Sequence, residues 1–211
     1  MTNYQDTAAM LQSWFSPAFP VGGFNYSHGL ETAIQTGLVT DQNSLFDWIS
    51  GVLKNGSGRN DALFVKAAYR GEECNMFCLS LASSKERYME TLELGSAFTK
   101  TVNSSFGLAL EENLAYPVAV GLAAASIKLD LRLTIQSFLQ SFASNLISVA
   151  VRHIPLGQTA GQSCLAKLLP IMKMLTDEIM ASSLHDIGGS AVVSDLVSMR
   201  HEYDEMRIYR T

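Results

Sequence analysis

One stretch, residues 130–153, constrains the fold more than any other part of this chain. Its apolar residues recur at intervals of three or four positions, the spacing that lines one face of an α-helix; they are Leu131, Ile135, Phe138, Leu139, Phe142, Leu146 and Val149. Asp130 stands where a helix N-cap belongs, and Pro155 and Gly157 stand where a helix has to end. The pattern predicts one long helix whose apolar stripe other elements must cover.

The same helical spacing dominates the rest of the chain. The segment 55–58 is expected to be a loop, and 16–23 to interrupt the helices near the N-terminus, because both are rich in helix-breaking residues. No alternating run of β-branched residues predicts a strand. We therefore predict an all-α, single-domain helical bundle around one or two buried central helices. Further helices are expected to begin at Asp6, Asn25 or Ser27, Asp41, Asp61, Glu72, Ser84, Pro117 and near Thr159.

The residues that follow Gly188 and Gly189 differ in character from those before them, since they are polar, charged and aromatic. This change divides the chain into an all-α domain, residues 1–188, and a C-terminal tail, residues 189–211. A short helix with few apolar residues is marginal in water, so the tail is expected to be mobile alone and to become ordered on a partner. The apolar residues that would share one face of a tail helix are Leu196, Met199, Tyr203 and Met206.

The composition excludes some classes of protein and favours another. Charged residues make up 17% of the 211 residues, against about 25% in an average protein, while 47% are hydrophobic. A chain this apolar is expected to hide part of its surface against partners. The net charge is −5 and no basic stripe interleaves with aromatics, which argues against nucleic acid as a partner. The longest near-apolar run, residues 115–127, is shorter than the roughly 20 residues that a membrane span needs.

The three cysteines favour reduced thiols in the cytoplasm. Cys74 and Cys78 are close in sequence and Cys164 is distant, so no disulfide framework is evident, and no basic N-terminal region precedes an apolar core as in a signal peptide. Cys74 and Cys78 would share one helix face and could hold a soft metal. A closed site needs about four ligands and no second pair is present, so burial as small hydrophobes is the preferred interpretation.

No catalytic motif is complete. Ser27 and His28 are adjacent, and on a helix their side chains would diverge by about 100°. One alternative stays open: an all-α metal-dependent enzyme that uses His28 and Glu31, three positions apart, together with Glu111 and Glu112. The remaining histidines are scattered and are expected to be structural or exposed. No phosphate-binding loop is present, because residues 56–58 lack the Lys-Ser/Thr that would follow, and no cofactor is expected.

Three longer segments stand out instead. Residues 16–31 have the sequence SPAFPVGGFNYSHGLE, residues 152–162 have RHIPLGQTAGQ, and the chain ends with MRHE at 199–202 and RIYRT at 207–211. In this order they resemble the UreF family of urease accessory proteins, and the likeness runs from Leu11 to the last residue. RIYRT stands where the family has Arg-Leu-Phe-Arg-Ser, and Gly23 stands where alanine is frequent. The changes in RIYRT keep the character of the motif, whereas Gly23 is expected to loosen its turn.

The resemblance implies an all-α homodimer that carries out no chemistry itself. UreF-like proteins bind a UreD/UreH-type accessory protein and recruit a UreG-type nickel-binding GTPase, and the assembly docks on apo-urease and delivers nickel. In this chain the resemblance implies two groups of residues. The partner-binding tail would be Met199, Arg200, His201, Glu202, Tyr203, Met206, Arg207 and Arg210. A partner surface or structural motif would comprise Pro17, Pro20, Gly22, Tyr26, Ser27, Gly29, Glu31, Arg152, Pro155, Gly157, Gln158, Gly161 and Gln162.

Overall fold

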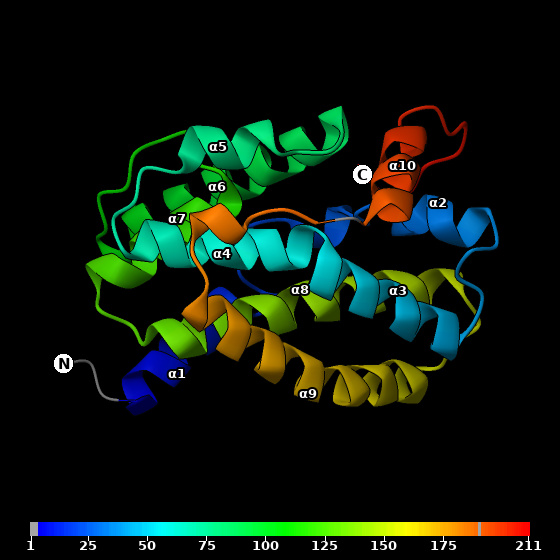
Figure 1. Cartoon of the computed structure of the whole chain (residues 1–211), viewed down its shortest axis with the longest axis horizontal. Helices are drawn as coiled ribbons and strands as arrows, with labels where there is room; N and C mark the ends of the chain where they lie inside the picture. Colours follow the sequence, from blue (N-terminus) through cyan, green and yellow to red (C-terminus); the bar gives the residue numbers. More distant parts are fainter. Residues whose placement is uncertain (1–3, 190) are drawn as a thin grey trace.

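Helices are the regular secondary structure of the part of the chain that the computed structural model describes, residues 4–189 and 191–211, and no strand occurs there (Figure 1). This confirms the predicted all-α class. The α-helices are α1 (Tyr4–Trp14), α2 (Leu30–Gln35), α3 (Gln42–Asn55), α4 (Ser57–Tyr69), α5 (Asn75–Ser80), α6 (Lys85–Phe106), α7 (Tyr116–Ser126), α8 (Leu131–His153), α9 (Gln158–Ala181) and α10 (Val192–His201). Two short 3₁₀ helices, η1 (Gly23–Asn25) and η2 (Leu184–Asp186), complete the elements.

Helix α8 is the central element that its sequence predicts. The side chain of Asp130 accepts a hydrogen bond from the N–H of Leu133 (2.8 Å) and so caps its N-terminus. The helix runs through the middle of the molecule and contacts α1, α2, α3, α4, α7 and α9 (Figure 1). Its stripe residues Ile135, Phe138, Leu139, Leu146 and Val149 are buried.

Helices α4 and α7 form the second buried layer. α7 packs against α4 on one side and α6 on another, and α4 also contacts α8 and α9. α7 and α4 approach closely at Gly121, where an added Cβ would lie 2.3 Å from the carbonyl oxygen of Val65. A side chain of any size at Gly121 would therefore push these helices apart.

Several helix boundaries differ from the prediction. The second helix begins at Leu30, because His28 and Gly29 have φ of 58° and 76° and cannot belong to a right-handed helix. The loop expected at 55–58 is a single residue, Gly56, between α3 and α4. The helix expected from Glu72 is the shorter α5, which begins at Asn75.

The end of the chain lies against the body of the protein. α10 packs on α2 and also contacts α6, and the C-terminal segment, which we define as residues 202–211, turns back toward the body (Figure 1). α10 ends at His201, so Tyr203 and Met206 do not extend its apolar face as the sequence pattern predicts. Tyr209 and Thr211 are 5% and 1% exposed. No helix among the described residues is long and apolar enough to cross a membrane.

Candidate functional site

A buried carboxylate, Glu31, organises a densely bonded polar site. It lies in the first turn of α2 and is 1% exposed. Its Oε1 accepts the backbone N–H of Ile208 (2.9 Å), and its Oε2 accepts that of Tyr209 (3.0 Å) and faces His201 Nε2 (3.1 Å). One side chain of the first motif thus holds both α10 and the C-terminal segment.

The surroundings of Glu31 favour its charged form. Burial raises the pKa of this carboxyl, but the N–H groups of Tyr209 and Ile208 and the imidazole of His201 outweigh burial, so its pKa lies below the ordinary value. A carboxylate in this position therefore stays ionised at neutral pH and stabilises the docked C-terminal segment.

His201 joins this carboxylate to a second one. Its ring is fully buried, with Nε2 facing Glu31 and Nδ1 lying 2.7 Å from Glu86 Oε2 on α6. The other oxygen of Glu86 accepts a hydrogen bond from Arg207 (3.0 Å). Glu31, His201, Glu86 and Arg207 form a row that connects α2, α10, α6 and the C-terminal segment, and we call it the anchor row.

Backbone hydrogen bonds add a second attachment next to the anchor row. The N–H of Ser27 donates to the carbonyl oxygen of Thr211 (3.1 Å), and the N–H of His28 donates to the Thr211 hydroxyl (3.2 Å). The N–H of Arg210 donates to the carbonyl oxygen of Asn25 (2.8 Å). Backbone polar groups in the turn before α2 thus form hydrogen bonds with the last two residues of the chain.

Tyr26 and Arg210 meet at the edge of this region. The Tyr26 hydroxyl donates to Glu93, and the Arg210 guanidinium donates to the other oxygen of Glu93 (2.8 Å) and lies 5.7 Å from the centre of the Tyr26 ring. Burial, followed by the neighbouring Glu93, raises the pKa of Tyr26, so the phenol stays protonated and donates.

The middle motif contributes its histidine, His153. The ring of His153, at the end of α8, packs on the ring of Tyr209 with centroids 5.2 Å apart, and its Nε2 lies 3.8 Å from Glu31 Oε1. All three motifs of the sequence therefore meet around Glu31. The sequence interpretation, which took His153 and His201 as scattered, missed this convergence.

The other residues singled out in the middle motif lie elsewhere. Arg152, Pro155, Gly157, Gln158 and Gln162 are exposed. Gly161 is buried where α9 crosses α8, and an added Cβ would lie 2.9 Å from Val151 and 3.0 Å from Ile147. The predicted connection between two helices is present, because α8 ends at His153 and α9 begins at Gln158.

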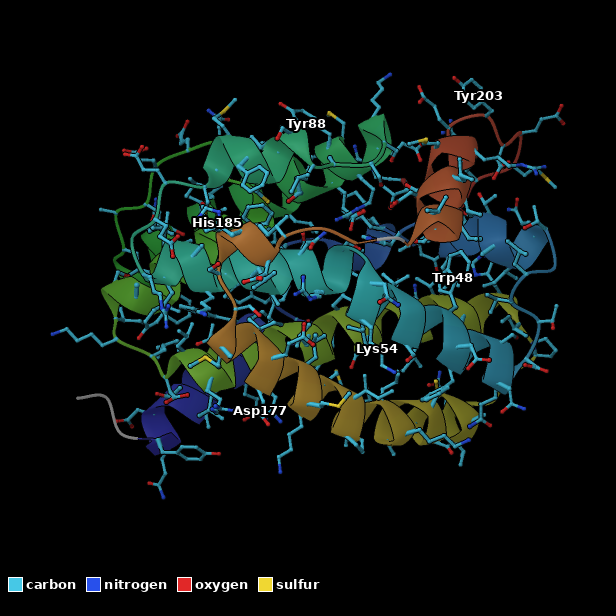
Figure 2. The ribbon with its side chains drawn as sticks, viewed as in Figure 1. Trp48, Lys54, Tyr88, Asp177, His185 and Tyr203 are labelled. Carbon is cyan, nitrogen blue, oxygen red and sulfur yellow. The ribbon has the colours of Figure 1, made fainter. Side chains whose placement is uncertain are left out.

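The predicted tail residues divide into exposed and buried members. Seven of the eight are exposed, and Tyr203 projects away from the body (Figure 2). His201 alone is buried. In the first motif Pro17 and Pro20 are exposed and Gly22 is partly buried, whereas Tyr26, Ser27, Gly29 and Glu31 are buried.

His28 belongs to a different polar cluster from Glu31. Its Nε2 bonds with the hydroxyl of Ser57, and its Nδ1 lies 3.6 Å from Glu90, which pairs with Arg87 (2.5 Å). Burial raises the pKa of Glu90, but Arg87 and His28 outweigh it and lower the pKa to about 2. The cluster ends at Asp61, which lies 3.6 Å from Arg87. Burial raises the pKa of Asp61 to about 6.

The alternative metal site does not assemble. Glu111 and Glu112 are exposed between α6 and α7, while Glu31 is occupied by the C-terminal segment. Nowhere in residues 4–189 and 191–211 do three or more His, Cys, Asp or Glu side chains form a group able to hold a metal ion. The prediction that combines His28 and Glu31 with Glu111 and Glu112 in one site is therefore wrong.

The cysteines behave as small apolar side chains. Cys74, Cys78 and Cys164 are free and buried in the hydrophobic core. Burial raises the pKa of Cys74 to about 11 and raises that of Cys78 as well, so both remain thiols at neutral pH. This agrees with the preferred interpretation of the Cys74 and Cys78 pair.

A hollow of about 850 Å³ lies beside the second polar cluster and is not evident from the sequence. Its walls come from α1 and the turn after it, α4, α6, α7 and α8, and Arg152 lies among its lining residues. Apolar side chains such as Phe15, Phe24 and Phe142 alternate there with small polar ones such as Ser141 and Ser144. The lining residues come from five separate parts of the chain, so no local pattern could reveal the hollow.

The fold and the site first define a class: an all-α protein whose C-terminal segment is held on the body by buried polar anchors. The model of the UreF family matches residues 39–169 of the chain. The urease accessory protein UreF of Roseobacter denitrificans is 38% identical over 211 residues, which cover 98% of this chain and 95% of that protein. UreF of Cereibacter sphaeroides strain KD131 is 44% identical over 210 residues, covering 97% and 100% of the two chains. The chain belongs to the UreF family of urease accessory proteins.

Proposed function

We propose that this protein is a scaffold and GTPase regulator in a cytoplasmic assembly that delivers nickel to apo-urease. In this proposal the chain forms a homodimer, binds a UreD/UreH-type accessory protein and recruits a UreG-type GTPase. Nickel is the cargo of the assembly, and the chain itself performs no chemistry. Membership of the UreF family and the exposed surface at the end of the chain support this role.

One observation carries the proposal: seven apolar side chains of α10 and the C-terminal segment face solvent, while Val197 and Tyr209 of the same elements are buried against the body. Exposed fractions range from 45% for Met199 to 83% for Met206. Exposed arginines accompany them, and apolar groups beside arginine are the mixture found in interface centres. The apolar members are Val192, Val193, Leu196, Met199, Tyr203, Met206 and Ile208.

The predicted tail, residues 189–211, enters the proposal as the segment that binds the UreD/UreH-type partner. In the isolated chain we propose that it exchanges between the docked arrangement and a free one. Binding would then hold the tail in one arrangement, and the tail would lose its conformational entropy at that step. The apolar side chains that face solvent supply the contact area for the partner.

Co-purification with separately tagged partners tests the surface. We expect Met206→Glu combined with Tyr203→Ser to fold normally, because both side chains are more than 80% exposed, and to lose binding of the UreD/UreH-type partner and urease activation. Met174→Glu is the matched control, since Met174 is 60% exposed on α9, and it should bind normally. Full-affinity capture by the double variant would refute this surface.

A second expectation concerns the nucleotide. The pure chain alone should neither bind nor hydrolyse GTP, and it should change nucleotide-dependent assembly only when the GTPase partner is present. Calorimetry and phosphate release with the isolated chain provide the measurement. Hydrolysis by the pure chain would contradict the role of a regulator without chemistry of its own.

A further inference from the structure

A fully buried histidine with a carboxylate on each ring nitrogen requires an unusual proton count. In His201, Nε2 lies 3.1 Å from Glu31 and Nδ1 lies 2.7 Å from Glu86, and the ring is 0% exposed. A neutral imidazole has one N–H and one lone pair, so it can donate to only one of the two carboxylates. Its lone pair would then face the other carboxylate without water to separate them.

The groups around the triad indicate where an additional proton lies. The N–H groups of Ile208 and Tyr209 stabilise Glu31 as a carboxylate, and Arg207 donates to Glu86 and stabilises that carboxylate too. A proton on the ring would let both carboxylates accept a hydrogen bond, and the anchor row would then alternate in sign: Glu31 negative, His201 positive, Glu86 negative, Arg207 positive.

One more titratable group faces the triad. His153 approaches from α8, where its Nδ1 lies 3.1 Å from the carbonyl oxygen of Val149 and so donates to it. Its Nε2 is buried without a hydrogen-bond partner, 3.8 Å from Glu31 Oε1. His153 is therefore a second imidazole beside Glu31, and an experiment must distinguish its ring from that of His201.

We propose that the proton shared by Glu31, His201 and Glu86 is a pH-sensitive latch for the C-terminal segment. With the imidazolium present, both carboxylates are bonded and α10 and residues 202–211 stay docked. When the pH rises and the proton leaves, one carboxylate faces a lone pair and the docked state weakens. The surface of α10 and the C-terminal segment is then released more often. This inference concerns the isolated chain and holds whatever partner the surface binds.

Hydrogen exchange tests the latch at the two amides that Glu31 accepts. The protection of Ile208 and Tyr209, normalised to the intrinsic exchange rate at each pH, should fall roughly tenfold or more between about pH 5.5 and pH 8.5. Amides of the buried α8 should stay equally protected throughout. Unchanged protection of Ile208 and Tyr209 over this range would overturn the proposal.

Three variants identify the group that makes the protection of Ile208 and Tyr209 depend on pH. His201→Gln and Glu86→Gln should each make the protection independent of pH, the latter because the amide that replaces the Glu86 carboxylate can donate to the lone pair of a neutral ring. His185→Gln, at an exposed histidine of η2, is the matched control and should keep the wild-type pH dependence. Retention of the wild-type profile by Glu86→Gln would overturn the proposal, and this variant keeps the buried ring in place should His201→Gln not fold.

A direct measurement needs no variant. The chain has four histidines, and their ring nitrogens are separable by ¹⁵N NMR. We expect one ring, correlated with the amides of the C-terminal segment, to carry protons on both nitrogens in the docked state at about pH 6 and to lose one as the segment undocks. A singly protonated His201 in the docked state would refute the latch, as would His153 titrating in its place.

Discussion

At the scale of single residues, the turn before α2 decides whether the end of the chain can dock. Gly29 has a φ of 76°, which L side chains rarely adopt, and α10 lies directly against it. An added Cβ would lie 3.1 Å from the backbone nitrogen of Ser198 and 3.2 Å from its Cα. Glycine at this position thus permits both the turn and the approach of α10.

We predict that Gly29→Ala destabilises the protein more than Gly37→Ala does. Gly37 also has a φ of 76° but nothing within 4 Å of an added Cβ, so its substitution carries only the backbone cost of about 1–2 kcal/mol. Gly29→Ala adds the collision with α10, about 1–3 kcal/mol more. Urea denaturation of the two variants measures the difference. Equal destabilisation would show that α10 does not press on this turn.

Glu31 supports a prediction with a defined pH dependence. Because its folded pKa is lowered, its contribution to stability is present above its ordinary value of 4.5 and is lost as the pH falls through the lowered pKa. Glu31→Gln should lower the free energy of unfolding by about 2 kcal/mol at pH 7. The difference in the free energy of unfolding between Glu31→Gln and the wild type should become smaller below pH 4.5. Glu111→Gln, at an exposed site, should change stability by less than about 0.5 kcal/mol throughout.

At the scale of elements, close helix crossings fix the core more firmly than helix propensity does. Gly121 in α7 would place a Cβ 2.3 Å from the carbonyl oxygen of Val65 and 2.8 Å from the Cβ of Ala68 in α4. Gly51 in α3 has nothing within 4 Å of an added Cβ. Both glycines lie inside a helix, but another helix packs directly against Gly121 and none packs against Gly51.

These two glycines give opposite predictions for the same substitution. Gly51→Ala should stabilise the protein by up to about 1 kcal/mol, since alanine favours the helix. Gly121→Ala should destabilise it by about 1–3 kcal/mol net, because overpacking against α4 exceeds that gain. Thermal unfolding followed by circular dichroism measures both. A neutral Gly121→Ala would mean that α4 and α7 separate without cost.

At the scale of the whole molecule, the low charge fraction and the exposed apolar side chains favour self-association. Seven exposed apolar side chains gather on α10 and the C-terminal segment, and a further group, which includes Met76, Tyr88 and Met89, lies on α5 and α6. We predict that sedimentation of the isolated chain shows dimers that form with increasing concentration. A monomer at high micromolar concentration would contradict a stable homodimer and leave only partner-dependent pairing.

The sequence determined the features that depend on neighbours along the chain. Asp41 and Asp130 cap α3 and α8 as predicted, because a capping side chain reaches only the first turn of its own helix. Asp6, predicted as a cap, lies inside α1 instead. The central position of α8 was predicted from its apolar stripe, because burial of apolar side chains away from water is favourable. The motifs indicated the UreF family, which the comparisons confirm.

Only the tertiary structure decided which polar groups meet. Glu31 and His201 are 170 residues apart, and His201 and Glu86 are 115 apart, so no local pattern places them together. His28 and Glu31 are close in sequence, yet the positive φ at His28 and Gly29 directs their side chains into two different polar clusters. The same packing buries His201 and leaves Met206 exposed, although the sequence places both in one tail. Periodicity specifies a face of a helix, but the crossing of several helices specifies the partner of each buried charge.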